Sequence, residues 1–346
     1  MAERRAFLDE GPLERRGVVT LNGRPERLFI ERGEPAPGQQ LGARSVGRVR
    51  RLERAAGLAF VELAAGPDAV LPLGPETGGL TEGAWIEAEV RSEAQGRKGP
   101  RVRLIGPADG PLRLLAAGPG LEERLAKFAA GEVVAGRRAR EIADVAQAEA
   151  LARSFALPGG GRLTVEPTQA LVAIDVDLGE RPGSEPKRAQ RAANLAAIGL
   201  AARVLRLKGL GGLVAIDLVG RGHDGPALLA AARAAFGADN PGVAMTGPSR
   251  FGLLELTIPR RIHPALEQLV DDEGWLLAAA IAADLARRLE DEARADPGGA
   301  IEARACAEVA AAVAPAVAEL NRRIGGRARV VADPALPRER FEVASP

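Results

Sequence analysis

Cysteine, histidine and tyrosine are scarce in this sequence, and their scarcity excludes several kinds of site. Its 346 residues include one cysteine, two histidines and no tyrosine. The single cysteine, Cys306, excludes an intramolecular disulfide framework and any zinc site built on paired cysteines of one chain, so no zinc is expected. A lone cysteine also fits a reducing compartment, and we expect a cytoplasmic protein.

Long apolar runs are missing as well. The longest one near the C-terminus, residues 275–283, stops at Asp284 and is much shorter than a membrane span. The N-terminal residues hold no apolar core of signal-peptide length. We therefore expect neither secretion nor insertion into a membrane.

The chain also lacks an excess of positive charge. Its formal net charge is +1 at pH 7, whereas a domain that binds nucleic acid through its overall charge is strongly basic. Arginine-rich patches do occur, although most such runs are solvated helix faces. They lie at residues 44–54, 97–103, 181–206 and 250–261. Any surface for nucleic acid must therefore be local.

What is present is a mixture of strand-like and helix-like segments that predicts an α/β protein. Residues 17–31 are typical of a hairpin around the turn signal Asn22-Gly23. Between residues 45 and 104, five short β-like segments separated by Gly, Pro and Asp turns indicate a small Greek-key barrel of the OB type. Near the C-terminus we expect two long helices, at 264–294 and 300–323, followed by strand-like segments.

The centre of the chain predicts a pair of parallel strands. Apolar runs at 171–177 and 211–217 flank a segment, 186–207, whose apolar residues recur at helical spacing. Strand, helix and strand joined in this way form a βαβ crossover, so the two strands are expected to be parallel and adjacent or nearly so. Their carboxyl ends then meet at one edge of the sheet, where ligands of open α/β sheets bind.

Both apolar runs end in acidic residues. Asp175 and Asp177 close the first run, and Asp217 closes the second. At one sheet edge these carboxylates would repel one another in a partly dehydrated place, and a divalent cation relieves that repulsion. Mg²⁺ prefers such oxygen ligands, and a bound metal activates water for phosphodiester hydrolysis. The alternative is that Asp175 caps a turn, Asp217 begins a loop and Asp177 is simply solvated.

Several stretches of the sequence resemble the ribonuclease E/G family. Those that resemble its catalytic region are AIDVD at 173–177, NLAA at 194–197, LKGLGGLVAIDL at 207–218 and SRFGLLEL at 249–256. Two stretches before residue 105, VGRVRRLERAAGLAFVELA and GRKGPRVRL, resemble the S1 RNA-binding domain that this family inserts near its N-terminus. The resemblance is continuous from about residue 150 to residue 262 and patchy or weak elsewhere.

The resemblance implies a Mg²⁺-dependent endoribonuclease that cleaves single-stranded RNA, with Mn²⁺ as an alternative ion. In the family two aspartates hold the metal, and they match Asp175 and Asp217. A third residue, usually Asn, orients them and matches Asp177. The additional negative charge of Asp at this position should strengthen metal binding or require a second ion.

The same resemblance implies RNA contacts at Phe60, Lys98 and Arg250. Phe60 matches an aromatic residue that stacks on a base, whereas the family's second aromatic falls at Val70. Each residue also has a structural alternative. Phe60 could be a core residue of the barrel, Lys98 a solvated loop lysine, and Arg250 a partner of Glu255 or another carboxylate.

Two features of the family are missing from the sequence. Only about fifty residues separate Ile105 from the catalytic region, so we infer that the insertion that senses a 5′-monophosphate is absent. No CPxC motif follows residue 256, so a homo-oligomer would not be joined by the family's shared zinc.

Together these observations predict a mixed α/β protein with a barrel and a smaller C-terminal α/β domain, and the resemblance implies that the catalytic core is RNase H-like and DNase I-like and that the barrel is an inserted S1/OB-type domain. The leading hypothesis is an endoribonuclease of RNA processing or decay, and the alternative is a catalytically inactive RNA-binding protein on the same scaffold. The expected divisions are a split scaffold at 1–38 and 106–157, the barrel at 39–105, the catalytic region at 158–262 and the C-terminal domain at 263–346.

Overall fold

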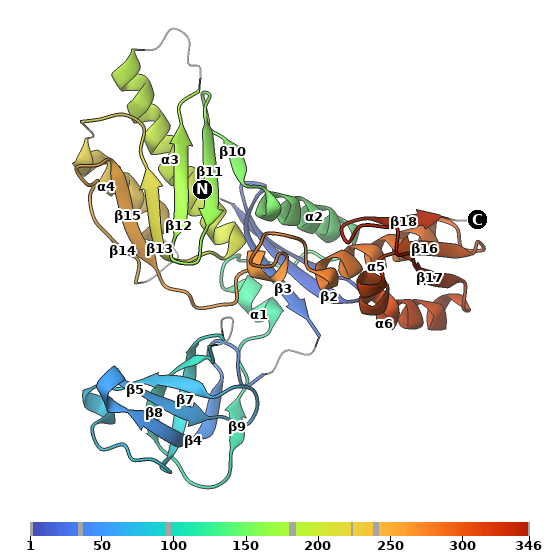
Figure 1. Cartoon of the computed structure of the whole chain (residues 1–346), viewed down its shortest axis with the longest axis horizontal. Helices are drawn as coiled ribbons and strands as arrows, with labels where there is room; N and C mark the ends of the chain where they lie inside the picture. Colours follow the sequence, from blue (N-terminus) through green and yellow to red (C-terminus); the bar gives the residue numbers. More distant parts are fainter. Residues whose placement is uncertain are drawn as a thin grey trace.

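The computed structural model describes residues 3–33, 37–94, 98–179, 185–222, 224–237 and 242–344. In these residues it forms four β-sheets with helices packed against them (Figure 1). The mixed α/β class expected from the sequence is confirmed. None of the helices in these ranges is long and apolar enough to cross a membrane.

The N-terminal sheet is a three-stranded antiparallel meander. Its strands are β1 (Arg4–Glu10), β2 (Glu14–Leu21) and β3 (Arg24–Arg32). Asn22 and Gly23 connect β2 to β3 with φ angles of 51° and 79°. Positive φ at both central residues is the geometry of a tight hairpin turn, so the predicted hairpin is confirmed.

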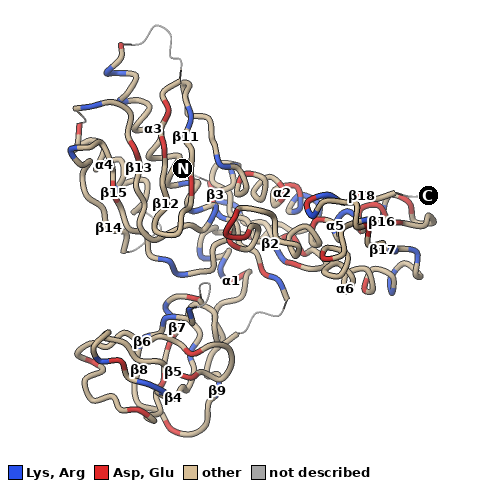
Figure 2. The backbone as a smooth tube through the Cα atoms, viewed as in Figure 1, with Lys and Arg blue, Asp and Glu red and all other residues tan. Residues whose placement is uncertain are grey.

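Residues on both sides of the barrel in sequence build this N-terminal unit. Helices α1 (Leu121–Ala126) and α2 (Arg137–Leu151) follow the barrel and pack on β1 and β2. The fully buried Arg16 joins the segments: its Nη2 donates to Asp9 at 2.6 Å and its Nη1 donates to Gln147 of α2 at 2.9 Å. Figure 2 shows basic and acidic residues together along this part of the chain. Removing a partner of such a buried arginine leaves an uncompensated charge, so these contacts specify how the segments meet.

Five strands close into a small barrel, and a sixth extends its sheet. They are β4 (Arg44–Glu53), β5 (Leu58–Glu62), β6 (Ala69–Pro72), β7 (Trp85–Ser92), β8 (Arg101–Pro107) and β9 (Arg113–Ala116), with two short 3₁₀ turns at Arg54–Ala56 and Pro75–Thr77. The strand order is β5-β6-β8-β7-β4, and an additional β5–β4 pairing closes it. This order is consistent with the OB type. Because β9 pairs with β4, the sheet extends past residue 105.

A six-stranded sheet follows, with strand order β10-β11-β12-β13-β15-β14. Its strands are β10 (Ser154–Ala156), β11 (Arg162–Pro167), β12 (Val172–Asp177), β13 (Gly212–Asp217), β14 (Ala244–Met245) and β15 (Leu253–Ile258). The β12–β13 pair is parallel, and the crossover between them is helix α3 (Pro186–Lys208). The predicted βαβ unit and its helix are therefore confirmed.

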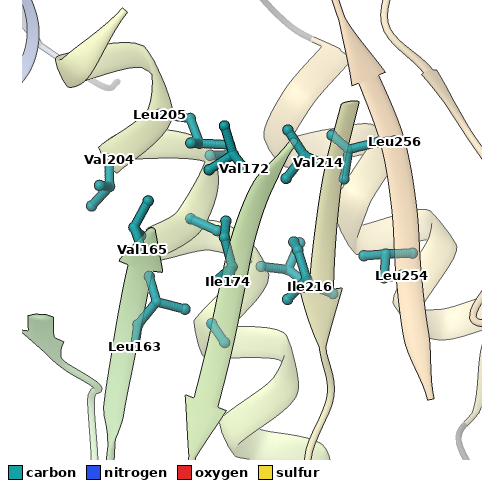
Figure 3. Packing of buried hydrophobic residues seen from close by; sticks show 14 of the residues in the cluster. Leu163, Val165, Val172, Ile174, Val204, Leu205, Val214, Ile216, Leu254 and Leu256 are labelled. Carbon is teal, nitrogen blue, oxygen red and sulfur yellow. The ribbon is translucent and has the colours of Figure 1, made fainter. Parts of the chain in front are cut away.

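One face of this sheet is covered and the other is open. Alternate residues of each strand, such as Ile174 and Ile216, point toward α3 and α4 (Gly225–Gly237) and form the largest core cluster (Figure 3). Each fully buried Val, Leu or Ile contributes about 1.5–3 kcal/mol relative to an exposed one. The residues between them face the other side of the sheet, where they are exposed or partly exposed.

The C-terminal unit differs from the two long helices expected there. It contains a 3₁₀ turn at Leu266–Gln268, α5 (Ala278–Ala295), β16 (Ile301–Ala305), α6 (Ala307–Ile324), β17 (Ala328–Ala332) and β18 (Phe341–Ala344). The expected helix at 264–294 begins only at Ala278, and the expected helix at 300–323 begins with a strand. In β16, residues Ile301, Ala303 and Ala305 are buried in alternation, which is strand periodicity that the alanine-rich context conceals.

A buried lysine joins α3 to the end of α2. Lys208 is 2% exposed, and its Nζ donates to the carbonyl oxygens of Ala150 at 2.5 Å and Ala152 at 2.6 Å. It therefore satisfies carbonyl groups that the last turn of a helix leaves without intrahelical partners. Burial and, to a smaller extent, the nearby charge of Arg153 lower the pKa of Lys208 to about 8.

This pKa makes the free energy of unfolding depend on pH. Between about pH 8 and 10.5 the unfolded chain holds the Lys208 proton and the folded chain does not, so stability rises with pH across this window. Below pH 8 this group adds no pH dependence, because both states are protonated. In chemical denaturation, the stability of the native protein relative to Lys208→Met should increase by up to about 3 kcal/mol from pH 7 to pH 10.5. The exposed Lys127→Met variant is the control. A stability difference that does not change with pH would contradict the lowered pKa of Lys208.

Candidate active site

Asp175 and Asp217 lie side by side on neighbouring strands. In the parallel pairing of β12 with β13, Asp175 is the register partner of Asp217. Paired strands are about 4.8 Å apart, and register partners point to the same face of a sheet. The expectation that the two carboxylates share one sheet edge is confirmed.

The acidic residues are solvent-exposed, contrary to the expectation of a partly dehydrated place. Asp175, Asp177 and Asp217 are all exposed, because they occupy the open face of the sheet. The carboxylates of Asp175 and Asp217 form no ion pair or hydrogen bond with another described residue. Their mutual repulsion is therefore screened by water, and both carboxylates are available to a ligand.

Asp177 lies farther along the same face and belongs to a turn. Its Oδ1 accepts a hydrogen bond from the backbone N–H of Gly179 at 2.9 Å. The glycine loop before β11 packs directly on this turn, since a Cβ at Gly161 would lie 2.3 Å from the carbonyl oxygen of Asp177. The structure thus brings Asp175 and Asp217 together and holds Asp177 in a local turn next to them.

Arg250 and Phe251 lie at the same end of the sheet. They occupy the turn before β15, where the carbonyl of Gly252 accepts a hydrogen bond from Leu218, the residue after Asp217. Phe251 is 74% exposed, and the Arg250 guanidinium lies 4.7 Å from the centre of its ring. Arg250 forms no ion pair with any described residue, so the expected alternative of a salt bridge to Glu255 is wrong. Nothing in the sequence indicated that the side chain of Phe251 would be exposed.

Asn194 is a positioning residue whose role the sequence analysis did not assign. Its side chain is buried on α3 and donates Nδ2–H to the carbonyl of Val219 at 3.0 Å, while its Oδ1 accepts from the N–H of Val219 at 2.9 Å. These two bonds hold the loop directly after Asp217. An asparagine on the apolar stripe of an alanine-rich helix was the available signal, because a buried amide needs partners.

The donor set fits a hard divalent cation held by few protein ligands. Two adjacent carboxylates on an open face suit Mg²⁺, which retains several waters when it binds to proteins. Within the described ranges, no group of three or more His, Cys, Asp and Glu side chains lies close enough to hold a metal ion. The geometry therefore supports a site of two carboxylates completed by water or by a ligand.

Phe60 lies on the outer surface of the barrel, and its alternative as a core residue is wrong. Its neighbours Ala59 and Val61 are fully buried, whereas Phe60 is partly exposed. Strand register places one row of residues across the outer face: Arg51, Phe60, Val70 and Arg101. The Arg51 guanidinium lies 4.5 Å from the centre of the Phe60 ring. Lys98 is exposed in the loop before β8, two residues from Pro100, whose carbonyl accepts from Val70.

The structure is thus that of an α/β protein with two features: paired acids at the carboxyl ends of parallel strands, where ligands of open α/β sheets bind, and a barrel that exposes an aromatic and basic row. Residues 138–261 match the model of the ribonuclease E/G family. Over this region the chain belongs to that family, and the matched range contains Asp175, Asp217 and Arg250.

Three curated proteins are similar to this part of the chain. The ribonuclease E/G-like chloroplastic protein of Arabidopsis thaliana is 31% identical over 127 residues, which are 35% of this chain and 13% of that protein. Ribonuclease E of Escherichia coli is 34% identical over 120 residues, 34% of this chain and 11% of that enzyme. Ribonuclease E of Haemophilus influenzae is 34% identical over 120 residues, 34% of this chain and 13% of that enzyme. The match thus spans only a small part of each relative.

Replacing Asn194 with alanine tests its positioning role. The variant leaves the N–H and carbonyl of Val219 without their partner, so we expect a loss of about 1–3 kcal/mol in unfolding free energy, measured by chemical denaturation. Asn194→Asp keeps the acceptor for the Val219 N–H but buries a carboxylate against the Val219 carbonyl oxygen, so it should lose at least as much. The matched control is Asn321→Ala, because Asn321 makes the same pair of bonds to Ala328 in the C-terminal unit. Altered backbone resonances of 217–219 in Asn194→Ala but not in Asn321→Ala would support the role, and unaltered ones would contradict it.

Proposed function

We propose that this chain is a divalent-metal-dependent endoribonuclease that cleaves single-stranded RNA. The single observation that carries the proposal is the in-register pairing of Asp175 and Asp217 on an open sheet face. The match of residues 138–261 to the ribonuclease E/G family supports it, since enzymes of that family generally use divalent metals. Asp175 and Asp217 would hold Mg²⁺, with Mn²⁺ as a substitute.

Each residue at the sheet edge has a distinct part in this proposal. When bound, the metal polarises the scissile phosphate and lowers the pKa of a bound water. Asp175 and Asp217 fix the ion's position, and Asp177 adds negative charge next to it. Arg250 binds a phosphate through its guanidinium fork. Phe251, being exposed beside Arg250, offers a surface for stacking of a neighbouring base.

The barrel would hold the RNA through its exposed row. Phe60 stacks on a base, Arg51 and Arg101 flank it with positive charge, and Lys98 contacts phosphate. The acids lie at the far end of the sheet from the junction with the barrel, because Asp217 pairs with Leu253 whereas the junction follows Ile258. Five residues of strand span about 17 Å. A bound strand would therefore run along the open face, past the exposed Leu213.

The proposal includes the finer domain assignments expected from the sequence. The split N-terminal unit would correspond to an RNase H-like scaffold, the barrel to an S1 domain, and the six-stranded unit to a DNase I-like region. Cleavage would not depend on a 5′-monophosphate, and any homo-oligomer would form without a shared zinc. We also assign the protein to the cytoplasm, since its only cysteine, Cys306, is a free thiol.

A second candidate function is a catalytically inactive RNA-binding protein on the same scaffold. It is favoured by the turn that engages Asp177 at the position of the family's usual Asn. Val70 in place of a second barrel aromatic is a further departure from the family pattern. Cleavage and binding assays separate the two candidates.

Asparagine variants of the paired acids test the nuclease proposal. Incubated with Mg²⁺, the protein should cut a labelled, unstructured RNA internally, and a chelator should abolish cutting. Asp217→Asn and Asp175→Asn should each lower the rate by about a hundredfold or more, because each removes a metal ligand. The control is Asp272→Asn, an exposed acid outside the site. RNA binding without metal-dependent cuts would favour the second candidate, and equal cutting by all variants would overturn the assignment of the site.

The barrel contact is tested separately in the Asp217→Asn background. Phe60→Ala should weaken binding of a single-stranded RNA by about 1–3 kcal/mol, the contribution of one stacked base, measured by fluorescence anisotropy. Val70→Phe should strengthen it, because it adds a second aromatic beside Phe60 in the same row. Trp275→Ala, another exposed aromatic, is the control. Unchanged affinity in Phe60→Ala would show that RNA does not use this face.

A further inference from the structure

A cavity lined by four arginines lies where the barrel, the N-terminal sheet and the six-stranded sheet meet. Its volume is about 210 Å³, and it is bounded by β3, α3, the last residue of β15 and the segment 259–262 that follows it. The arginines are Arg27, Arg206, Arg260 and Arg261. No acidic side chain is among the described residues that line it. A concave site with one sign of charge concentrates its field on an anion.

One buried and one partly buried arginine form the inner wall of this cavity. Arg206 donates Nη2–H to Glu26 at 2.8 Å and Nη1–H to the carbonyl of Ala235 at 2.8 Å. Its Nε is also buried and has no hydrogen-bond partner among the described residues. Arg27 is 8% exposed and lies 3.9 Å from the centre of the Phe128 ring. Arg206 and Arg27 are thus held in place at the cavity wall by contacts within the protein.

Two glycines allow the third arginine, Arg260, to lie close to the backbone at the start of β13. Arg260 donates Nε–H to the carbonyl of Gly211 at 2.9 Å. Gly212 has a φ angle of +89°, and a Cβ there would lie 2.9 Å from the same Nε. The two glycines thus allow the guanidinium to lie against the start of β13, which leaves its two Nη atoms for a ligand.

We propose that this cavity binds the phosphate group of a nucleotide or of RNA. The guanidinium forks match phosphate oxygens bidentately, and arginine is the residue suited to partly buried phosphate sites. The cavity volume of about 210 Å³ has room for a phosphate group and for part of the nucleoside attached to it. Apolar residues such as Phe128 line the remainder and suit the attached nucleoside.

A ligand in this cavity would also affect the barrel, because it would contact Arg260 and Arg261, whose backbone is hydrogen-bonded to the barrel. The carbonyl of Arg260 accepts a hydrogen bond from Ser92 Oγ at 2.7 Å, and the carbonyl of Arg261 accepts from the N–H of Glu93 at 2.9 Å. The Glu93 carboxylate accepts in turn from the N–H of His263 at 2.9 Å. A phosphate that fixes Arg260 and Arg261 therefore stabilises the junction between barrel and sheet.

Calorimetric titration of the full chain tests the proposal with three probes: inorganic phosphate, AMP and adenosine. Phosphate and AMP should bind and adenosine should not. The double variant Arg260→Gln/Arg261→Gln should weaken AMP binding by about a hundredfold, roughly tenfold for each arginine. Arg322→Gln, an exposed arginine of the C-terminal unit, should leave it unchanged. Equal binding of AMP and adenosine, or AMP binding that is unaffected by the double variant, would overturn the proposal.

Competition between AMP and RNA for the Asp217→Asn variant shows whether the phosphate in the cavity comes from RNA or from a free nucleotide. If RNA supplies it, AMP should displace a short single-stranded RNA, and the double variant should weaken RNA binding. If a free nucleotide supplies it, AMP should bind alongside RNA without competition. Both outcomes keep the site, and neither depends on RNA cleavage, so failure of the nuclease proposal leaves this test intact.

Discussion

The candidate site depends on one constraint, the parallel pairing of β12 with β13 in the register that sets Asp175 against Asp217. A shift by one residue would turn Asp217 toward the core, because successive side chains of a strand face opposite sides. The buried partners Ile174 and Ile216 oppose such a shift from the covered face. The same register that builds the core therefore places the two acids together.

Glycines fix the two ends of this strand pair. After α3, Gly209 adopts a φ of +72° and ends the helix, and Gly212 begins β13 with its backbone against Arg260. At the opposite end, Gly161 allows the loop before β11 to contact the turn that holds Asp177. Side chains at these positions would collide with backbone or guanidinium atoms, so the glycines serve close packing around the site and the cavity alike.

Local signals made much of the fold predictable. The Asn22-Gly23 turn, the five short barrel strands and the crossover helix α3 follow from residue types at fixed spacing, and each agrees with the structure. Tertiary packing decided the rest. The run before Asp177 indicated a buried strand, yet only one face of it is covered, because α3 and α4 pack on the same side. The sequence also left open whether Phe60 faces the barrel core, because which face of a strand is covered depends on tertiary packing. Strand β16 was not predicted, because its alanine-rich sequence resembles that of the neighbouring helices.

The exposure of Asp175 and Asp217 has a consequence for how the proposed nuclease would work. Two solvated carboxylates hold a divalent ion weakly, since Mg²⁺ binding normally draws on phosphate oxygens of the substrate as well. Arg250 and the exposed Phe251 lie next to these acids and offer contacts to an RNA strand but not to the ion. RNA that engages them would bring its phosphate oxygens to the paired acids. Metal and RNA would then strengthen each other's binding by the same factor, as linkage requires. The open face would thus act as a complete site only when the RNA strand is in place, because the sheet supplies two carboxylates and leaves the remaining ligands to water and to the substrate.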